Sequence, residues 1–92
     1  MAVLSLPPEL TQREASACLQ SLASALAASP EPAVVIDAAP LQRFDSTALA
    51  VLLACRRRAE AGGKTVAVRG LPDKLRQLAA VYGVDTLLTE VV

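Results

Sequence analysis

Three observations on this 92-residue chain predict an α/β fold, a small open and mostly parallel sheet with alternating strands and helices. Short apolar runs alternate three times with longer segments of helical periodicity, which is typical of right-handed βαβ units. Hydrophobic residues make up 53% of the sequence, enough for the core of one domain, which we expect to span residues 1–92. The apolar residues are mostly Ala, Leu and Val, with one Phe, one Tyr and no Trp, and small side chains suit helices packed closely on a sheet.

The elements of the first half follow in order. Residues 2–6 form a short apolar run that Pro7 and Pro8 end, which predicts a strand. From residue 9 to residue 28 the pattern is helical, and the Ser-Pro-Glu-Pro segment at 29–32 ends this helix. The apolar stripe of the helix comprises Leu10, Cys18, Leu19, Leu22 and Leu26. Residues 33–37 are a continuous apolar run, as in a strand buried on both faces.

The second half repeats the alternation. A second helix is predicted from about Ser46 to residue 61, where Gly62 and Gly63 supply the positive φ that helix ends require. Residues 64–69 are another strand. A third helix opens at Pro72, and its predicted buried stripe is Leu75, Leu78, Ala79 and Tyr82. The tail, residues 86–92, is expected to form a short helical turn and then a strand.

Charge and composition exclude several function classes. Nine Lys and Arg balance nine Asp and Glu, and aromatic platforms are missing, so we expect no nucleic-acid partner. The chain has no His and no Gly-rich phosphate loop, so neither a metal, a cofactor nor a bound nucleotide is expected. No apolar stretch is long enough for a membrane span and no secretory signal is present, which predicts a cytoplasmic protein. We therefore expect Cys18 and Cys55 to be buried free thiols.

The most informative segment follows the central strand and enters the second helix. Asp45, Ser46 and Thr47 are all good N-cap residues, and one interpretation is that they only satisfy free N–H groups of the first turn. The other is that the two hydroxyls form an exposed polar knob for a partner. No catalytic residue is predicted, because the usual activating base is missing. A carboxylate pair of Asp37 and Asp45 is the weaker enzymatic alternative.

The run Arg56-Arg57-Arg58 is the one cluster of like charge. Three consecutive helical positions spread over much of the helix circumference, so at least one arginine must flank the buried face. A solvated surface is the first interpretation. The second is a contact with an acidic partner surface or anionic headgroups, for which Arg56 and Arg57 are the candidates.

The segment Phe44-Asp45-Ser46-Thr47-Ala48-Leu49, placed between a strand and a helix, resembles a STAS domain, the fold of bacterial anti-sigma factor antagonists. The family pattern is Asp-Ser-[Ser/Thr]-Gly-Leu, and the resemblance implies that Ser46 is the hydroxyl that a kinase phosphorylates. Ala48 stands where the family prefers Gly, which would hinder a close backbone approach by a kinase. Family members also carry an extra strand before the first one predicted here, so one edge of this sheet is expected to be exposed or paired with another chain.

The ending Leu78-Ala79-Ala80-Val81-Tyr82-Gly83 resembles the branch of the family that serves the Mla phospholipid ABC transporter. The resemblance is closer over residues 33–88 than over residues 2–28. It implies a non-catalytic subunit that binds and regulates or stabilises the ABC-type ATPase through Ser46 and Thr47, meeting the membrane only through the transporter, at its cytoplasmic face. The alternative is an anti-sigma factor antagonist that binds an anti-sigma serine kinase and is released when Ser46 is phosphorylated.

Overall fold

The computed structural model describes residues 2–91. Strands and helices alternate along the chain, as the sequence predicts. The elements are β1 (Ala2–Ser5), β2 (Glu9–Leu10), α1 (Gln12–Ala28), β3 (Ala33–Asp37), β4 (Arg43–Phe44), α2 (Thr47–Ala61), β5 (Thr65–Arg69), α3 (Asp73–Val81) and the 3-10 turn η1 (Asp85–Leu87).

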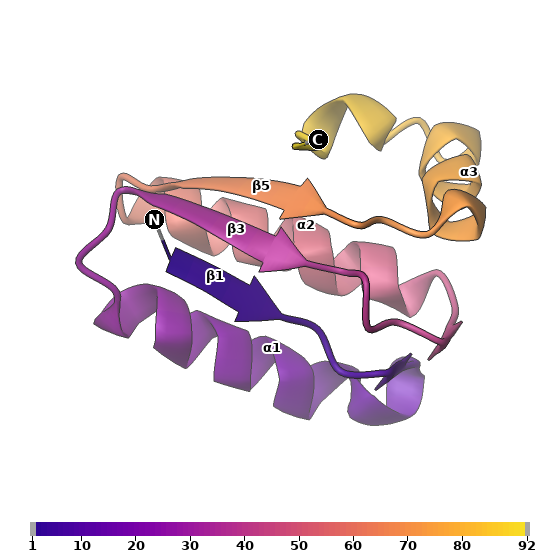
Figure 1. The fold of residues 1–92 in the computed structure, drawn as a ribbon, viewed down its shortest axis with the longest axis horizontal. Helices are drawn as coiled ribbons and strands as arrows, with labels where there is room; N and C mark the ends of the chain where they lie inside the picture. The colour runs from indigo at the N-terminus through magenta and orange to yellow at the C-terminus, as the bar shows by residue number, and fades with distance from the viewer. Residues whose placement is uncertain (1, 92) are drawn as a thin grey trace.

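The main sheet is parallel, with strand order β1-β3-β5. Its register aligns Val3, Val35 and Ala67 across the three strands. Helices α1 and α2 lie side by side and cover one face, whereas α3 and η1 lie beyond the carboxyl end of β5 (Figure 1). This confirms the predicted α/β class with a small parallel sheet.

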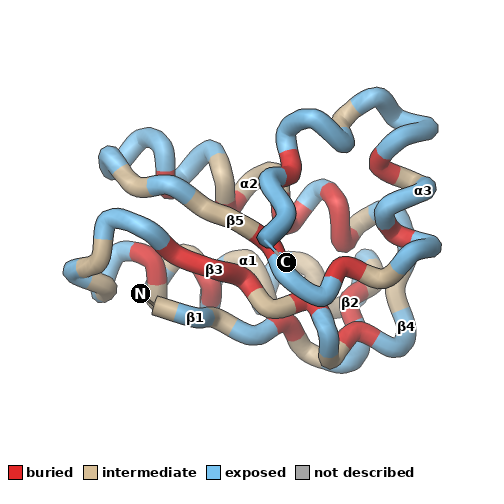
Figure 2. The backbone as a smooth tube through the Cα atoms, turned by 45° about the horizontal axis from the view of Figure 1, so that its top comes forward, coloured by how far each residue is buried: buried red, intermediate tan, exposed pale blue. Residues whose placement is uncertain are grey.

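The core lies between the sheet and the helices. Its largest fully buried side chains include Ile36 from β3, Leu52 from α2 and Leu75 from α3. Figure 2 shows β3 as a mostly buried central strand between more exposed neighbours. The continuous apolar run of residues 33–37 therefore has the position that the sequence indicates, with the predicted bounds.

The prediction that α1 begins at residue 9 is wrong. Glu9 and Leu10 form β2, which pairs in parallel with β4, and the helix begins only at Gln12. Leu10 is fully buried, so its spacing fits the apolar stripe although it belongs to a strand. The true start carries a capping box: the Thr11 side chain accepts a hydrogen bond from the backbone, and the Glu14 carboxylate accepts the Thr11 N–H at 2.9 Å.

The third helix differs at its end. Tyr82, predicted to lie on the buried stripe, is 58% exposed because it follows the last helical residue. Of the other predicted stripe residues, Leu75 and Ala79 are buried and Leu78 is half-buried. The tail forms the predicted helical turn, and Glu90 then bridges β5 at Val68. Val92, which the prediction included, lies outside the described residues.

Both cysteines are free thiols, as expected. Cys55 is buried, and its burial raises the pKa of the thiol to about 11, so the group is protonated at neutral pH. Cys18 is only half-buried, in contrast to the prediction, because it faces a hollow between α1 and the end of β1.

Candidate functional site

The starts of α1 and α2 lie next to each other. The parallel pair β2 and β4 aligns Glu9 with Arg43 and Leu10 with Phe44, and each strand leads directly into a helix. Two helix N-termini, each with free N–H groups and a partial positive charge, therefore meet at one end of the molecule. The three candidate residues at positions 45–47 lie at this end.

The capping role belongs to Asp45. Its Oδ1 accepts a hydrogen bond from the N–H of Thr47 at 2.8 Å, and its carbonyl accepts one from Ala48 at 3.1 Å. Ser46 occupies the cap position with helical backbone angles, but its side chain makes no capping hydrogen bond. The capping interpretation thus holds for the Asp45 carboxylate and fails for the Ser46 hydroxyl, which lies on an exposed residue.

The Asp45 carboxylate is held in its charged form. Hydrogen bonds from the Thr47 side chain and backbone lower the pKa of Asp45, and the backbone of Gln12, at the start of α1, contributes in the same direction. The same end of the molecule therefore presents a fixed negative charge directly beside the Ser46 hydroxyl. A second negative group on Ser46 would meet this charge.

Ala48 does not lie on the contact surface. Its side chain is fully buried in the core cluster beneath the first turn of α2. The expectation that a methyl group here hinders a partner's approach is therefore wrong. The Ala48 methyl group instead adds apolar contact inside the protein.

The side chains of the arginine run lie on two different sides of α2. Arg57 and Thr47 line the same hollow of about 420 Å³ between the two helices, at positions about 15 Å apart along the helix axis. Arg56 is on the other side, where it forms an ion pair with Glu60 at 3.0 Å. The structure thus brings Arg57, but not Arg56, into one surface with Thr47 of the candidate contact.

Helix α1 contributes two residues that the sequence did not single out, Ala15 and Ser16, together with Leu19. Ala15, Ser16 and Leu19 form its side of the hollow that contains Thr47 and Arg57. Leu19, predicted to lie on the buried stripe, is only half-buried at the margin of the core. The small side chains of Ala15 and Ser16 carry no distinctive signal in the sequence, so only the packing of α1 on α2 reveals them.

The carboxylates of Asp37 and Asp45 accept hydrogen bonds in two different turns. The Asp37 carboxylate accepts the Ala39 N–H at 3.0 Å and lies 3.4 Å from the Arg69 guanidinium, whereas Asp45 caps α2.

Over residues 2–91 no polar or charged side chain is buried, and no cluster of three or more His, Cys, Asp or Glu fits a metal ion. No helix in this range is long and apolar enough to cross a membrane. The site is thus an exposed polar surface beside an apolar hollow, an arrangement suited to contact with another molecule.

The comparisons with known proteins identify the family. A family model described as "Mlab, STAS domain" matches residues 1–90, so the chain belongs to the STAS-domain family. Its fold is similar to that of the unphosphorylated anti-sigma factor antagonist SpoIIAA, with TM-score 0.75 and 16% identity over 98% of this chain and 78% of that one. It is also similar to an anti-sigma-factor antagonist (STAS) domain protein from Planctomyces limnophilus, with TM-score 0.78 and 18% identity over 96% and 79%. No curated protein matches the chain.

Proposed function

We propose that this STAS domain is a non-catalytic interaction module that docks on a protein partner through the start of α2, centred on Ser46 and Thr47. The hollow that runs from Thr47 to Arg57 extends the contact along the helix. Family membership supports a protein partner, since STAS domains in general act as interaction modules.

The observation that carries this proposal is the unused hydroxyl of Ser46. A serine at a helix start normally contributes a capping hydrogen bond, but here the Asp45 carboxylate performs that task. Ser46 is exposed, and it is flanked by a charged carboxylate and by the half-buried Thr47. Folding therefore leaves this hydroxyl available for recognition.

The partner proposed is the cytoplasmic ATPase subunit of a phospholipid ABC transporter. The matching family model is described as Mlab, and the segment Leu78-Ala79-Ala80-Val81-Tyr82-Gly83 resembles the same branch. In this role the chain stabilises or regulates the ATPase at the cytoplasmic face of the inner membrane, while ATP and lipid bind to other subunits. The exposed, partly apolar surface of α2 is of the kind that a folded protein surface covers.

The second candidate is an anti-sigma factor antagonist. Both solved structures described above carry that function in their descriptions, and the one of SpoIIAA is of the unphosphorylated form. In this role an anti-sigma serine kinase binds the start of α2 and transfers phosphate to Ser46. The new charge next to Asp45 then drives the partners apart.

Two purified partners from the same genome distinguish the candidates. The chain is titrated, by calorimetry, into the ABC-type ATPase subunit and into an anti-sigma kinase, and Ser46 is followed by mass spectrometry in the presence of ATP. Tight binding to the ATPase with no phosphate on Ser46 supports the transporter role. Phosphate on Ser46 with release of the kinase supports the second role. Binding to neither protein contradicts both.

A further inference from the structure

The two edges of the main sheet differ in their backbone hydrogen bonding. Along β5, the backbone of Val68 donates to Thr89 at 2.7 Å and accepts from Val91 at 2.9 Å, so residues 89–91 cover the carboxyl end of this edge. Arg76 fixes the cover by hydrogen bonds to both carboxylate oxygens of Glu90 at 2.8 and 3.0 Å. Along β1, no strand among residues 2–91 pairs with the outer edge.

The geometry of β1 identifies its free groups. The N–H of Leu6 donates to the carbonyl of Asp37 at 2.9 Å, so the even-numbered residues of this segment point their backbone groups toward β3. The N–H and C=O groups of Val3 and Ser5 therefore point outward. Both residues are exposed, and an unpaired strand edge of this kind readily accepts another strand.

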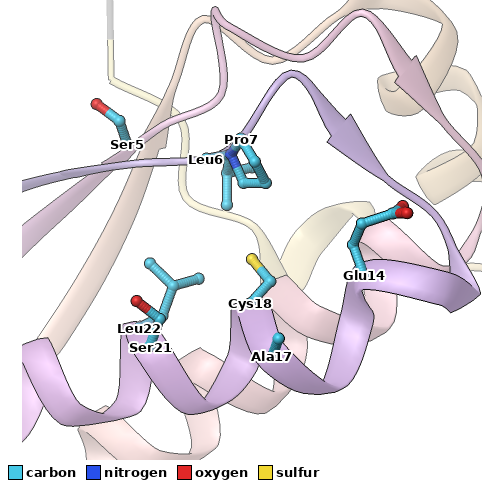
Figure 3. A pocket seen from close by; sticks show the side chains of 8 residues that line it. All are labelled: Ser5, Leu6, Pro7, Glu14, Ala17, Cys18, Ser21 and Leu22. Atoms are coloured by element: carbon cyan, nitrogen blue, oxygen red, sulfur yellow. The ribbon is translucent and has the colours of Figure 1, made fainter.

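An apolar hollow lies directly below this edge. Figure 3 shows Cys18 and Leu22 pointing up from α1 toward Leu6 and Pro7, and the hollow between them measures about 420 Å³. Its one charged lining residue is Glu14, whose carboxylate is already occupied by the N–H and hydroxyl of Thr11. A strand added to β1 would place alternate side chains over this hollow.

We propose that the occupant of the β1 edge is the β1 strand of a second copy of this chain, paired antiparallel so that the two sheets join into one. The edge residues Ala2, Val3, Leu4 and Ser5 are uncharged and the formal net charge of the chain is zero, so the paired strands place no like charges opposite each other. Pairing around a twofold axis also closes the assembly, because it uses the one β1 edge of each copy, and at both remaining outer edges residues 89–91 cover the carboxyl end of β5.

The register follows from the direction of the free groups. Pairing Val3 with Ser5 of the second copy, and Ser5 with Val3, gives every outward N–H and C=O of β1 a partner. The twofold axis then passes between the two Leu4 residues, which form a pair without mutual backbone hydrogen bonds and with Cα atoms about 4.5 Å apart. Both Leu4 side chains lie on the helix side of the sheet, because Leu4 packs against the core.

Sedimentation velocity over a range of concentrations tests the dimer. The wild-type chain is expected to form dimers, and Ser5→Pro is expected to raise the dimer dissociation constant at least about tenfold, since it removes an outward N–H and no bond to β3. Val3→Lys, which puts a charge on the edge without a ring, is expected to do the same if Ser5→Pro does not fold. Tyr82→Lys, on the exposed end of α3, is the matched control and should leave the dimer intact.

Cysteine crosslinking tests the register. In a Cys18→Ala background, Leu4→Cys should give a covalent dimer on mild oxidation, because the two new thiols face each other across the axis. Val3→Cys should not, because Ser5 of the second copy lies opposite. A monomeric wild type at high concentration, equal crosslinking of both variants, or a dimer that is lost only in Tyr82→Lys would overturn the proposal. None of these results bears on docking at Ser46, which is on a different element.

Discussion

The Asp45 carboxylate accepts the N–H of Thr47 at 2.8 Å, and this bond leaves the hydroxyl of Ser46, the residue between them, without a role in capping α2. One residue of the motif thus stabilises the helix while its neighbour remains free for a partner. The division explains how a short segment serves both folding and recognition.

The first prediction separates these two roles by stability. Asp45→Ala should lower the melting temperature by on the order of 5 °C, because the first turn of α2 loses its capping acceptor. Asp45→Asn keeps an acceptor and should recover most of the loss. Ser46→Ala should change the melting temperature little. A larger drop in melting temperature for Ser46→Ala than for Asp45→Ala, measured by circular dichroism, would show that Ser46 and not Asp45 caps α2.

The second prediction concerns the core under α2. Leu52 is 1% exposed and packs between α2 and the sheet, so Leu52→Ala should lower the free energy of unfolding by about 2–5 kcal/mol. In a domain whose total stability is about 5–10 kcal/mol, this change nearly unfolds the protein. Leu53→Ala is the matched control, since Leu53 is only half-buried and should cost less. Equal losses of unfolding free energy in the two variants, measured by urea denaturation, would mean that the face of α2 assigned to the sheet is wrong.

The third prediction rests on Gly70, directly after β5. Its φ of +68° is unfavourable for other residues, and a Cβ there would come within 2.9–3.1 Å of Ala39, including its backbone. Gly70→Ala should therefore cost more than about 1 kcal/mol of unfolding free energy. Gly63→Ala separates the two causes, because Gly63 has a similar φ of +75° with nothing within 4 Å of the added carbon. Similar losses for both variants would mean that contact with Ala39 contributes nothing.

The fourth prediction concerns pH. The hydrogen bonds from Arg76 lower the pKa of Glu90 below that of an ordinary glutamate, so this carboxylate stabilises the fold above its unfolded pKa. That contribution should be lost as the pH falls through the lowered pKa. Glu90→Gln should reduce stability at pH 7 and weaken the dependence on pH in the acid range. Parallel stability curves of the two proteins between pH 7 and pH 3 would contradict the role of this pair.

The sequence predicts local features of the fold better than paired ones. The bounds of β3 follow from one continuous apolar run, and the end of α1 follows from the prolines after Ser29. The start of α1 does not, because β2 exists only through its pairing with β4, more than thirty residues away. Leu10 fits a helical stripe and a buried strand position equally well, so periodicity cannot separate the two.

The candidate site shows the same limit. The segment at positions 45–47 is identified by its residue types, but three residues that all favour the N-cap do not reveal which one performs it. Likewise, the sequence shows three arginines in a row, but which of them faces the candidate site depends on how α2 packs. Arg57 faces α1 and the hollow with Thr47, whereas Arg56 pairs with Glu60.

The most direct test of the docking surface compares partner affinity with stability in Ser46→Asp. The dissociation constant for the ATPase subunit, or for the kinase if that protein binds, is measured by calorimetry beside the melting temperature. Ser46→Asp should fold normally and lose at least about tenfold in affinity, because it adds a second carboxylate beside Asp45 at the contact. Ser24→Asp, the same change on the exposed side of α1, should bind like the wild type. Wild-type affinity in Ser46→Asp would contradict the account and place the interface elsewhere.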